Sequence, residues 1–291
     1  TNSELLQTQN RISTGLRVSS ASDNAAYWSI ATTMRNDRQS ISTVSDALGL
    51  GSATAEIASK GIESAIKIAS EIKDKLLAAR TPGVDRSKIQ AEIGELQESL
   101  KAVVDGASFN GQNWLKTDSS EESARTIVSS FSRGSDGKIS IGTISVDLGE
   151  TRLIDSTAST GASTGGILDG EIAMASGSDT VTVLDLDISA LEDTEDDLAD
   201  LEAMISGVDA AIEKMTDAAS TLGAVKTRID IQKDFADSLM SAIDKGVGQL
   251  VDADMNEEST RLQALQVRQQ LGIQALGIAN QSAQSILSLF R

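Results

Sequence analysis

The chain has 291 residues and a formal net charge of −18 at pH 7. Aromatic residues are only 2% of the composition, which argues against a large globular core, and a single proline is compatible with long uninterrupted helices. The absence of both cysteine and histidine excludes disulfides, a thiolate nucleophile, the usual structural zinc sites and histidine-based catalysis. A chain this acidic also lacks the basic face that nucleic acid binding requires, so we expect no nucleic acid partner.

The negative charge is concentrated in the middle of the sequence. Residues 117–200 hold 18 acidic and 4 basic residues, a balance of −14, which leaves only −4 for the rest of the chain. This pattern predicts a solvated acidic module attached to a nearly neutral scaffold. No apolar stretch approaches the ~20 residues that span a bilayer, so we expect no membrane insertion. No signal peptide is recognisable, so we expect any export to use a route that needs none.

The N-terminal third has a helical pattern with one interruption. Residues 1–35 begin helically, but Gly15 and the serines at 19–22 interrupt the pattern, which predicts a helix, an irregular connector and a second helix. Apolar residues then recur at heptad spacing. They predict a helix over 36–80, a turn at 81–85 around Pro82 and a helix over 87–105. The residues expected to pack these helices are Ile41, Val44, Leu48, Ile62, Ile72 and Leu96.

The periodicity changes after residue 106. Asn110-Gly111 is a strong signal for a tight hairpin turn. Alternating apolar residues predict one strand over 139–148 and another over 180–188. Between these strands, residues 149–180 are rich in Gly, Ser, Thr and Ala, which indicates a loop or a weakly structured insertion. Trp28 and Trp114 are expected to be packing anchors.

A second long heptad series begins near residue 195. Thr194, followed by three acids, is typical of a helix N-cap, and the helix is expected to pack through Leu201, Ile205, Ile212, Leu222 and Ile243. The pattern predicts a mainly α fold with a small β lobe: an elongated antiparallel bundle of paired N- and C-terminal arms plus a central β-containing lobe. The expected parts are the connector region 1–35, shaft helices and hairpin 36–116, an acidic outer lobe 117–194, a shaft helix 195–250 and a terminal helix 251–291.

The terminal helix has an apolar series that lacks an obvious partner in the sequence. Because no complementary segment remains, we expect this series to be covered only by another molecule. Its members are Leu262, Leu265, Leu276, Ala279, Ala283, Ile286 and Phe290.

The acids at 192–200 could bind calcium, but they lack the spacing and central glycine of an EF-hand loop. Favourable charge at a helix N-terminus explains them more simply. No glycine-rich phosphate-binding motif stands at a strand–helix junction. We therefore expect no catalytic residues, no metal site and no cofactor.

Several separate segments resemble bacterial flagellin. They are RISTGLRVSSASDNAAYWSIATTMR near the start, SKIQAEIGELQ and SFNGQNWL before the acidic middle, and MNEESTRLQALQVRQQLGIQALGIANQSAQSILSLFR at the end. The AAYWSIATTMR and LFR variants are most similar to flagellins of alphaproteobacteria. The resemblance covers roughly 1–116 and 195–291 and leaves the middle without a detailed match.

The resemblance implies a structural subunit that is exported to the cell exterior and self-assembles into the bacterial flagellar filament used for swimming. The partners it implies are other flagellin subunits, the flagellar type III export apparatus, a secretion chaperone, and the hook-associated and cap proteins. Flagellins begin with roughly two dozen more residues than this sequence, so we expect those residues to be missing here and this form to build no stable filament. The residues expected at the subunit interface are Ile12, Leu16, Arg17, Leu262, Leu265, Leu276, Ala279, Ala283, Ile286, Leu289, Phe290 and Arg291.

Three other functions are weighed against this one. A hook–filament junction protein shares the terminal architecture, but the run of C-terminal motifs favours flagellin. An enzyme with carboxylates in the acidic lobe and a surface adhesion module are the alternatives from other classes. Vertebrate innate receptors read an Arg-Glu-Leu pattern in many flagellins. Residues 72–77 lack that pattern, so we expect weak or absent receptor activation.

Overall fold

The computed structural model describes residues 2–118, 124–134, 136–156, 165–177 and 180–289, with side chains up to residue 279 in the last helix. The chain forms two compact units, one from residues 1–42 and 237–291 and the other from residues 43–236. Helices dominate both units, and the described strands all lie in the second, so the predicted mainly α fold with a small β lobe is confirmed.

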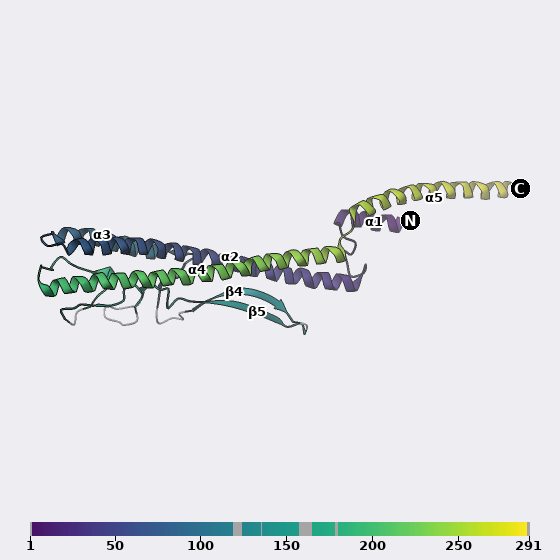
Figure 1. Ribbon diagram of the computed structural model, residues 1–291. Coiled ribbons are helices and arrows are strands. Elements are labelled where there is room, and N and C mark those ends of the chain that lie inside the picture. The colour runs from purple at the N-terminus through teal and green to yellow at the C-terminus, as the bar shows by residue number, and fades with distance from the viewer. Residues whose placement is uncertain (1, 119–123, 135, 157–164, 178–179, 290–291) are drawn as a thin grey trace. The chain divides into compact units, whose positions relative to one another are not determined.

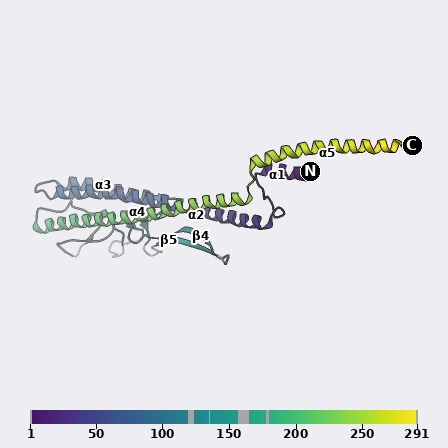
Figure 2. The ribbon, with the colours of Figure 1, turned by 45° about the vertical axis from the view of Figure 1, so that its right-hand side comes forward.

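Three helices form the scaffold of the second unit: part of α2 (Ala25–Ala79), α3 (Arg86–Gly106) and part of α4 (Glu195–Val251). Figures 1 and 2 show them side by side. Polar contacts fix the direction of α2 and α4: Ser52 Oγ donates to Asp230 at 2.8 Å, and Lys73 Nζ lies 2.9 Å from Asp209. Because numbers rise along α2 as they fall along α4, the two helices are antiparallel.

Buried apolar residues at heptad spacing hold these helices together. On α2 they include fully buried alanines at 55, 58, 65 and 69, whose small side chains allow close approach of the helices. Of the residues expected to pack the shaft, most are buried and four are half-buried. The buried ones are Ile41, Val44, Leu48, Ile62, Ile72, Leu201 and Leu222; the half-buried ones are Leu96, Ile205, Ile212 and Ile243.

Helix α2 begins at Ala25, eleven residues before the regular heptads, because Asn24 caps it. The Asn24 side-chain oxygen accepts from the Tyr27 backbone N–H at 3.0 Å. Trp28 follows in the first turns and is 38% exposed, so the expectation that it is a packing anchor is wrong, whereas Trp114 is buried. Thr194 caps α4 as predicted, since its hydroxyl accepts from the Asp197 backbone N–H at 3.2 Å.

In its described residues, the β lobe contains four separate strand pairs. β1 (Ser108–Phe109) and β2 (Gln112–Asn113) enclose the predicted Asn-Gly turn, in which both residues have positive φ. β4 (Ala124–Arg133) and β5 (Ile139–Asp147) form the longest hairpin, as the alternation predicted. β3 (Lys116–Thr117) pairs in parallel with β6 (Ile154–Asp155), and β7 (Ile172–Ala173) pairs antiparallel with β8 (Thr180–Val181).

The predicted strand over 180–188 is wrong beyond residue 181. The segment instead turns into a short 3-10 helix, η1 (Val183–Asp185), and its backbone pairs with side chains of α3. Gln97 donates to the carbonyls of Val183 and Leu186, each at 3.2 Å, and Gln90 accepts from the Ile188 N–H at 3.0 Å. These side-chain hydrogen bonds satisfy backbone N–H and C=O groups that in a sheet would bond to a neighbouring strand.

The insertion at 149–180 is more ordered than the composition indicated, at least in its described parts. Leu153 and Leu168 are fully buried, and the backbone of residues 152–154 bonds to residues 115 and 167–168. The expectation of a weakly structured segment is therefore wrong for 151–155 and 165–173, while residues 157–164 and 178–179 lie outside the described residues.

Candidate assembly surfaces

In the first unit, the connector that begins at residue 15 is hydrogen-bonded to the junction at residues 250–253. Its helices are α1 (Asn2–Thr14), α5 (Met255–Leu289) and the adjoining ends of α2 and α4. The Arg17 N–H donates to the Val251 carbonyl at 2.7 Å, and the Ala253 N–H donates to the Gly15 carbonyl at 2.9 Å. Gly15 has a φ of +72°, a conformation that favours glycine, so the sequence interruption there is structural.

Charged side chains reinforce this pairing. The Arg17 guanidinium donates to the Leu250 carbonyl at 3.0 Å, where α4 leaves unpaired carbonyls and a partial negative charge. Asp23 accepts hydrogen bonds from the Ser20 and Ser19 backbone N–H groups and from both serine hydroxyls. These bonds, the Ser20 backbone bond first, hold the pKa of Asp23 below its ordinary value. The connector is therefore a folded junction.

Helix α1 covers the beginning of α5. Arg11 forms an ion pair at 2.9 Å with Glu258, which is buried, and Gln269 donates to Asn2 at 2.8 Å. Leu265 is only 6% exposed. The expectation that the whole terminal series lacks a partner in this chain is therefore wrong for its first part, because the described α1 is long enough to reach residue 269.

Beyond residue 269, α5 is uncovered among the residues whose side chains are described. Large apolar residues stand in solvent, with Leu276 66% exposed. The uncovered group is Leu271, Ile273, Leu276 and Ile278, and Ala279 is exposed as well; Val267, just before this stretch, is also exposed. The side chains of Ala283, Ile286 and Leu289, and the residues Phe290 and Arg291, lie outside the described part of the chain. Ile12, Leu16 and Leu262 are half-buried.

These apolar residues occupy two opposite faces of α5. At about 100° per residue, Leu262, Leu265, Ile273 and Leu276 fall on one face, and Val267, Leu271 and Ile278 fall roughly 180° away. Helix α1 contacts the first face, as the burial of Leu265 shows. No residue in the sequence from 269 to 290 is charged. A helical stretch with two apolar faces and no charged residues is typical of a segment that is enclosed on several sides.

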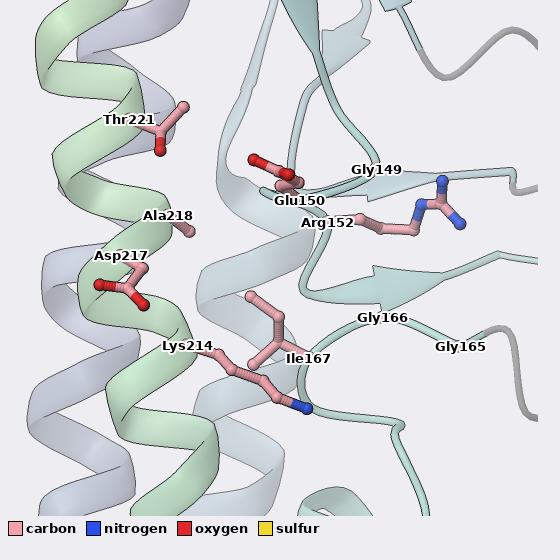
Figure 3. A pocket seen from close by; sticks show the side chains of 10 residues that line it. All are labelled: Gly149, Glu150, Arg152, Gly165, Gly166, Ile167, Lys214, Asp217, Ala218 and Thr221. Carbon is pink, nitrogen blue, oxygen red and sulfur yellow. The ribbon is translucent and has the colours of Figure 1, made fainter.

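A surface pocket of about 450 Å³ lies between α4 and the β lobe (Figure 3). Lys214, Asp217, Ala218 and Thr221 line it from α4, opposite Glu150 and the turns near Arg152. The Arg152 guanidinium points away from α4 and pairs with Asp155 at 3.3 Å. With no cysteine or histidine in the chain, the pocket lacks the usual nucleophile–base pair.

The acids at 192–200 act within the fold. Asp193 pairs with Arg86 at 2.6 Å, Asp197 accepts from the Thr194 hydroxyl at 2.7 Å, and Asp200 bonds to Ser176. Hydrogen bonding to Thr194 lowers the pKa of Asp197, and hydrogen bonding to Ser176 lowers that of Asp200. Within the described ranges, no group of three or more acidic side chains is placed to hold a metal ion. The described helices also include none long and apolar enough to cross a membrane.

These features define a class of protein, a long helical structural subunit whose described terminal helix exposes apolar side chains. The model of the bacterial flagellin N-terminal helical region matches residues 1–120, and the model of the C-terminal helical region matches residues 205–290. The chain therefore belongs to the bacterial flagellin family and is a structural subunit of the extracellular flagellar filament, not an enzyme.

Relatives in two genera support this assignment over the whole chain. Flagellin C of Rhizobium meliloti is 45% identical over 300 residues, covering 100% of this chain and 94% of that protein. Flagellin A of the same species is 40% identical, covering 99% of this chain and 95% of that protein. A flagellin of Brucella melitensis is 40% identical, covering 100% of this chain and 93% of that protein. A crystal structure of Bacillus cereus flagellin aligns at 17% identity with a TM-score of 0.39, covering 68% of this chain and 88% of that one, which is too distant to support an argument.

Proposed function

We propose that this subunit joins the filament through both apolar faces of α5. The supporting observation is the change in exposure along one face: Leu265 is buried by α1, whereas Leu276, three turns further on, is exposed. Copies of the same chain, together with the N-terminal residues that the flagellin resemblance implies ahead of Thr1, supply the remaining cover in the filament. Burying one large aliphatic side chain stabilises a contact by about 1.5–3 kcal/mol, so several such contacts per subunit are enough to drive polymerisation.

The proposed interface includes a second face of α5 that is absent from the interface predicted from the sequence. The face opposite α1, formed by Val267, Leu271 and Ile278, was not among the expected interface residues, because the apolar series was treated as one stripe. A helical wheel over residues 262–278 could have identified it. Arg17 also differs in role from a simple interface residue, since it already bonds to the end of α4 in its own chain.

A charge placed on the second face tests this proposal. We expect Leu271→Asp, in cells whose only flagellin is this chain with the expected N-terminal residues restored, to reduce filament length and number strongly, because a carboxylate cannot be buried unpaired. Gln270→Asp is the matched control, since it adds the same charge to an exposed position between the two faces. Electron microscopy and quantification of sheared filaments provide the measurement. Filaments of normal length and yield from Leu271→Asp would count against the proposed face.

Export and capping partners complete the proposed function. The subunit leaves the cell through the flagellar type III apparatus with the help of a secretion chaperone, and it meets the hook-associated and cap proteins at the filament ends. The support for this part is family membership alone. Secretion of the chain into the medium should stop when the export apparatus is deleted and fall when the chaperone is deleted. Undiminished secretion without the apparatus would refute the route.

Weak or absent activation of the vertebrate innate receptor is a further prediction. On α2, Lys73 pairs with Asp209 and Lys75 pairs with Glu92. Both lysines are therefore engaged within the chain, and neither provides the accessible arginine–glutamate pair of the recognised pattern. Reporter cells exposed to the purified chain should respond far less than cells exposed to a flagellin that carries the Arg-Glu-Leu pattern. An equal response at equal dose would contradict this prediction.

A further inference from the structure

The β4–β5 hairpin has an apolar face that its own chain leaves exposed. Its other face is packed: Ile127 and Ile144 are paired across the strands and buried, and a Cβ added at Gly51 of α2 would lie 2.6 Å from Ile127. The face turned away from this contact presents Val128, Ile139 and Ile141, and Ile141 is 62% exposed.

The strand register explains how this second face arises. Val128 lies opposite Thr143, but the register shifts before Ser130, which lies opposite Gly142. A bulge of this kind inserts one residue and changes the side on which later residues point. Phe131 consequently lies opposite Ile141. Its side chain is half-buried and packs against the hydrophobic core, so the exposed part of the outer face is formed by Val128, Ile139 and Ile141.

This arrangement is costly for a hairpin left in water. Two-stranded hairpins are only marginally stable alone, and among the described strands β4 and β5 pair only with each other. Their outer edges therefore have no strand neighbour within the part of the chain that the structure describes. Large apolar residues gathered on one face of such a ribbon mark an interaction surface.

The hairpin also differs in charge from the rest of the chain. Its sequence from 124 to 147 contains three bases and two acids, 3 − 2 = +1, whereas the whole chain carries −18. An acidic surface can approach it without the like-charge repulsion that opposes contact elsewhere. The bases are Arg125, Arg133 and Lys138, and the acids are Asp136 and Asp147.

We propose that a second copy of this chain covers the outer face of the hairpin, formed by Val128, Ile139 and Ile141, in the filament. A second copy has the acidic surface that a slightly basic hairpin can approach without like-charge repulsion. In a polymer, such a copy lies next to every subunit. A contact between this face and a different surface of the next copy is heterologous, the kind that continues into an open filament. This inference rests on the proposed assembly function and adds a contact surface outside α5.

Single cysteines test the contact without background, because the chain has none of its own. Ile141→Cys and Ser140→Cys place the thiol on adjacent residues of β5 that face opposite ways, and both positions are exposed. We expect N-ethylmaleimide to alkylate Ile141→Cys about tenfold more slowly in isolated filaments than in subunits released from them, because the thiol must first be uncovered. Ser140→Cys should react at similar rates in both states.

The outcomes separate this contact from assembly itself. Equal alkylation of Ile141→Cys in filaments and released subunits would overturn the hairpin contact alone. Failure of the unsubstituted protein to form filaments once the expected N-terminal residues are restored would overturn the proposed assembly function and this inference with it. As a second measure, Ile139→Ser combined with Ile141→Ser should lower the temperature at which filaments dissociate while leaving the unfolding temperature of the free subunit unchanged. Unchanged filament dissociation would also contradict the contact.

Discussion

The Arg86 side chain is buried and is hydrogen-bonded to groups from separate segments of the chain. Its side chain is 8% exposed and donates to the Ala79 carbonyl at 3.1 Å, the Leu191 carbonyl at 3.0 Å and the Asp193 carboxylate at 2.6 Å. It therefore joins the end of α2, the start of α3 and the segment before α4. The heptad pattern did not reveal this role, because Arg86 lies just outside the predicted helix.

Removal of this side chain should be costly. We expect Arg86→Ala to lower the free energy of unfolding by about 2–3 kcal/mol, since it leaves buried carbonyls and a carboxylate without their charged partner. Arg80→Ala is the control, because its pair with Glu202 is half-exposed and such pairs contribute roughly 0–1 kcal/mol. Urea unfolding followed by circular dichroism measures both. Equal losses in the two variants would contradict the role assigned to Arg86.

Asp23 provides a pH prediction for the connector. Its folded-state pKa is lowered, so the stability it contributes is present above the ordinary pKa of about 3.9 and is lost as pH falls through the lower folded value. The Ser19 and Ser20 amide resonances should therefore titrate with a midpoint below about 3.9, and the Asp23→Asn variant should lack this titration. A midpoint at or above the ordinary value would show that the hydrogen bonds to Asp23 are absent in solution.

At the scale of elements, two glycines on α4 have opposite predicted effects. A Cβ added at Gly207 would lie 2.6 Å from three side-chain atoms of Ile172 in β7, whereas a Cβ at Gly223 would meet nothing within 4 Å. The β lobe therefore approaches α4 closely at Gly207. A helical pattern alone gives no reason to distinguish the two.

Alanine at each position measures this difference. Gly223→Ala should stabilise the protein by up to about 1 kcal/mol through helix propensity. Gly207→Ala gains the same propensity but displaces Ile172, so its unfolding temperature should fall below that of the unsubstituted protein. Differential scanning calorimetry of both variants provides the comparison. A rise in stability for both would show that the lobe does not pack closely against α4.

The elements predicted correctly are those whose signal is repeated or local. The helices of the shaft repeat their apolar spacing over many turns, and the Asn110-Gly111 turn and the Thr194 cap depend on adjacent residues. The failure at 180–188 has a tertiary cause, because Gln90 and Gln97 of a distant helix bond to that backbone. Alternation alone cannot distinguish a strand from an extended segment that side chains satisfy.

At the scale of the whole molecule, the sequence predicts the terminal helix as an assembly surface but does not predict its division into a part that α1 covers and a part that is exposed. The charge-free stretch after Arg268 is visible in the sequence, whereas the cover that α1 gives to Leu265 is a tertiary contact. The hairpin face is not apparent from alternation alone for a similar reason, since only the observed register places Val128 opposite Thr143, on the face that also presents Ile139 and Ile141. Exposed apolar surfaces are thus predicted least well where they depend on what the chain itself buries.

Hydrogen exchange of α5 tests the central claim most directly. Measured by mass spectrometry on released subunits, the amides of residues 270–279 should exchange rapidly, because no described part of the chain packs against their side chains. The same amides should be strongly protected in intact filaments, while those around Leu265 should change less because α1 already covers that side. Equal exchange of 270–279 in the two states would contradict an account in which other copies enclose this helix.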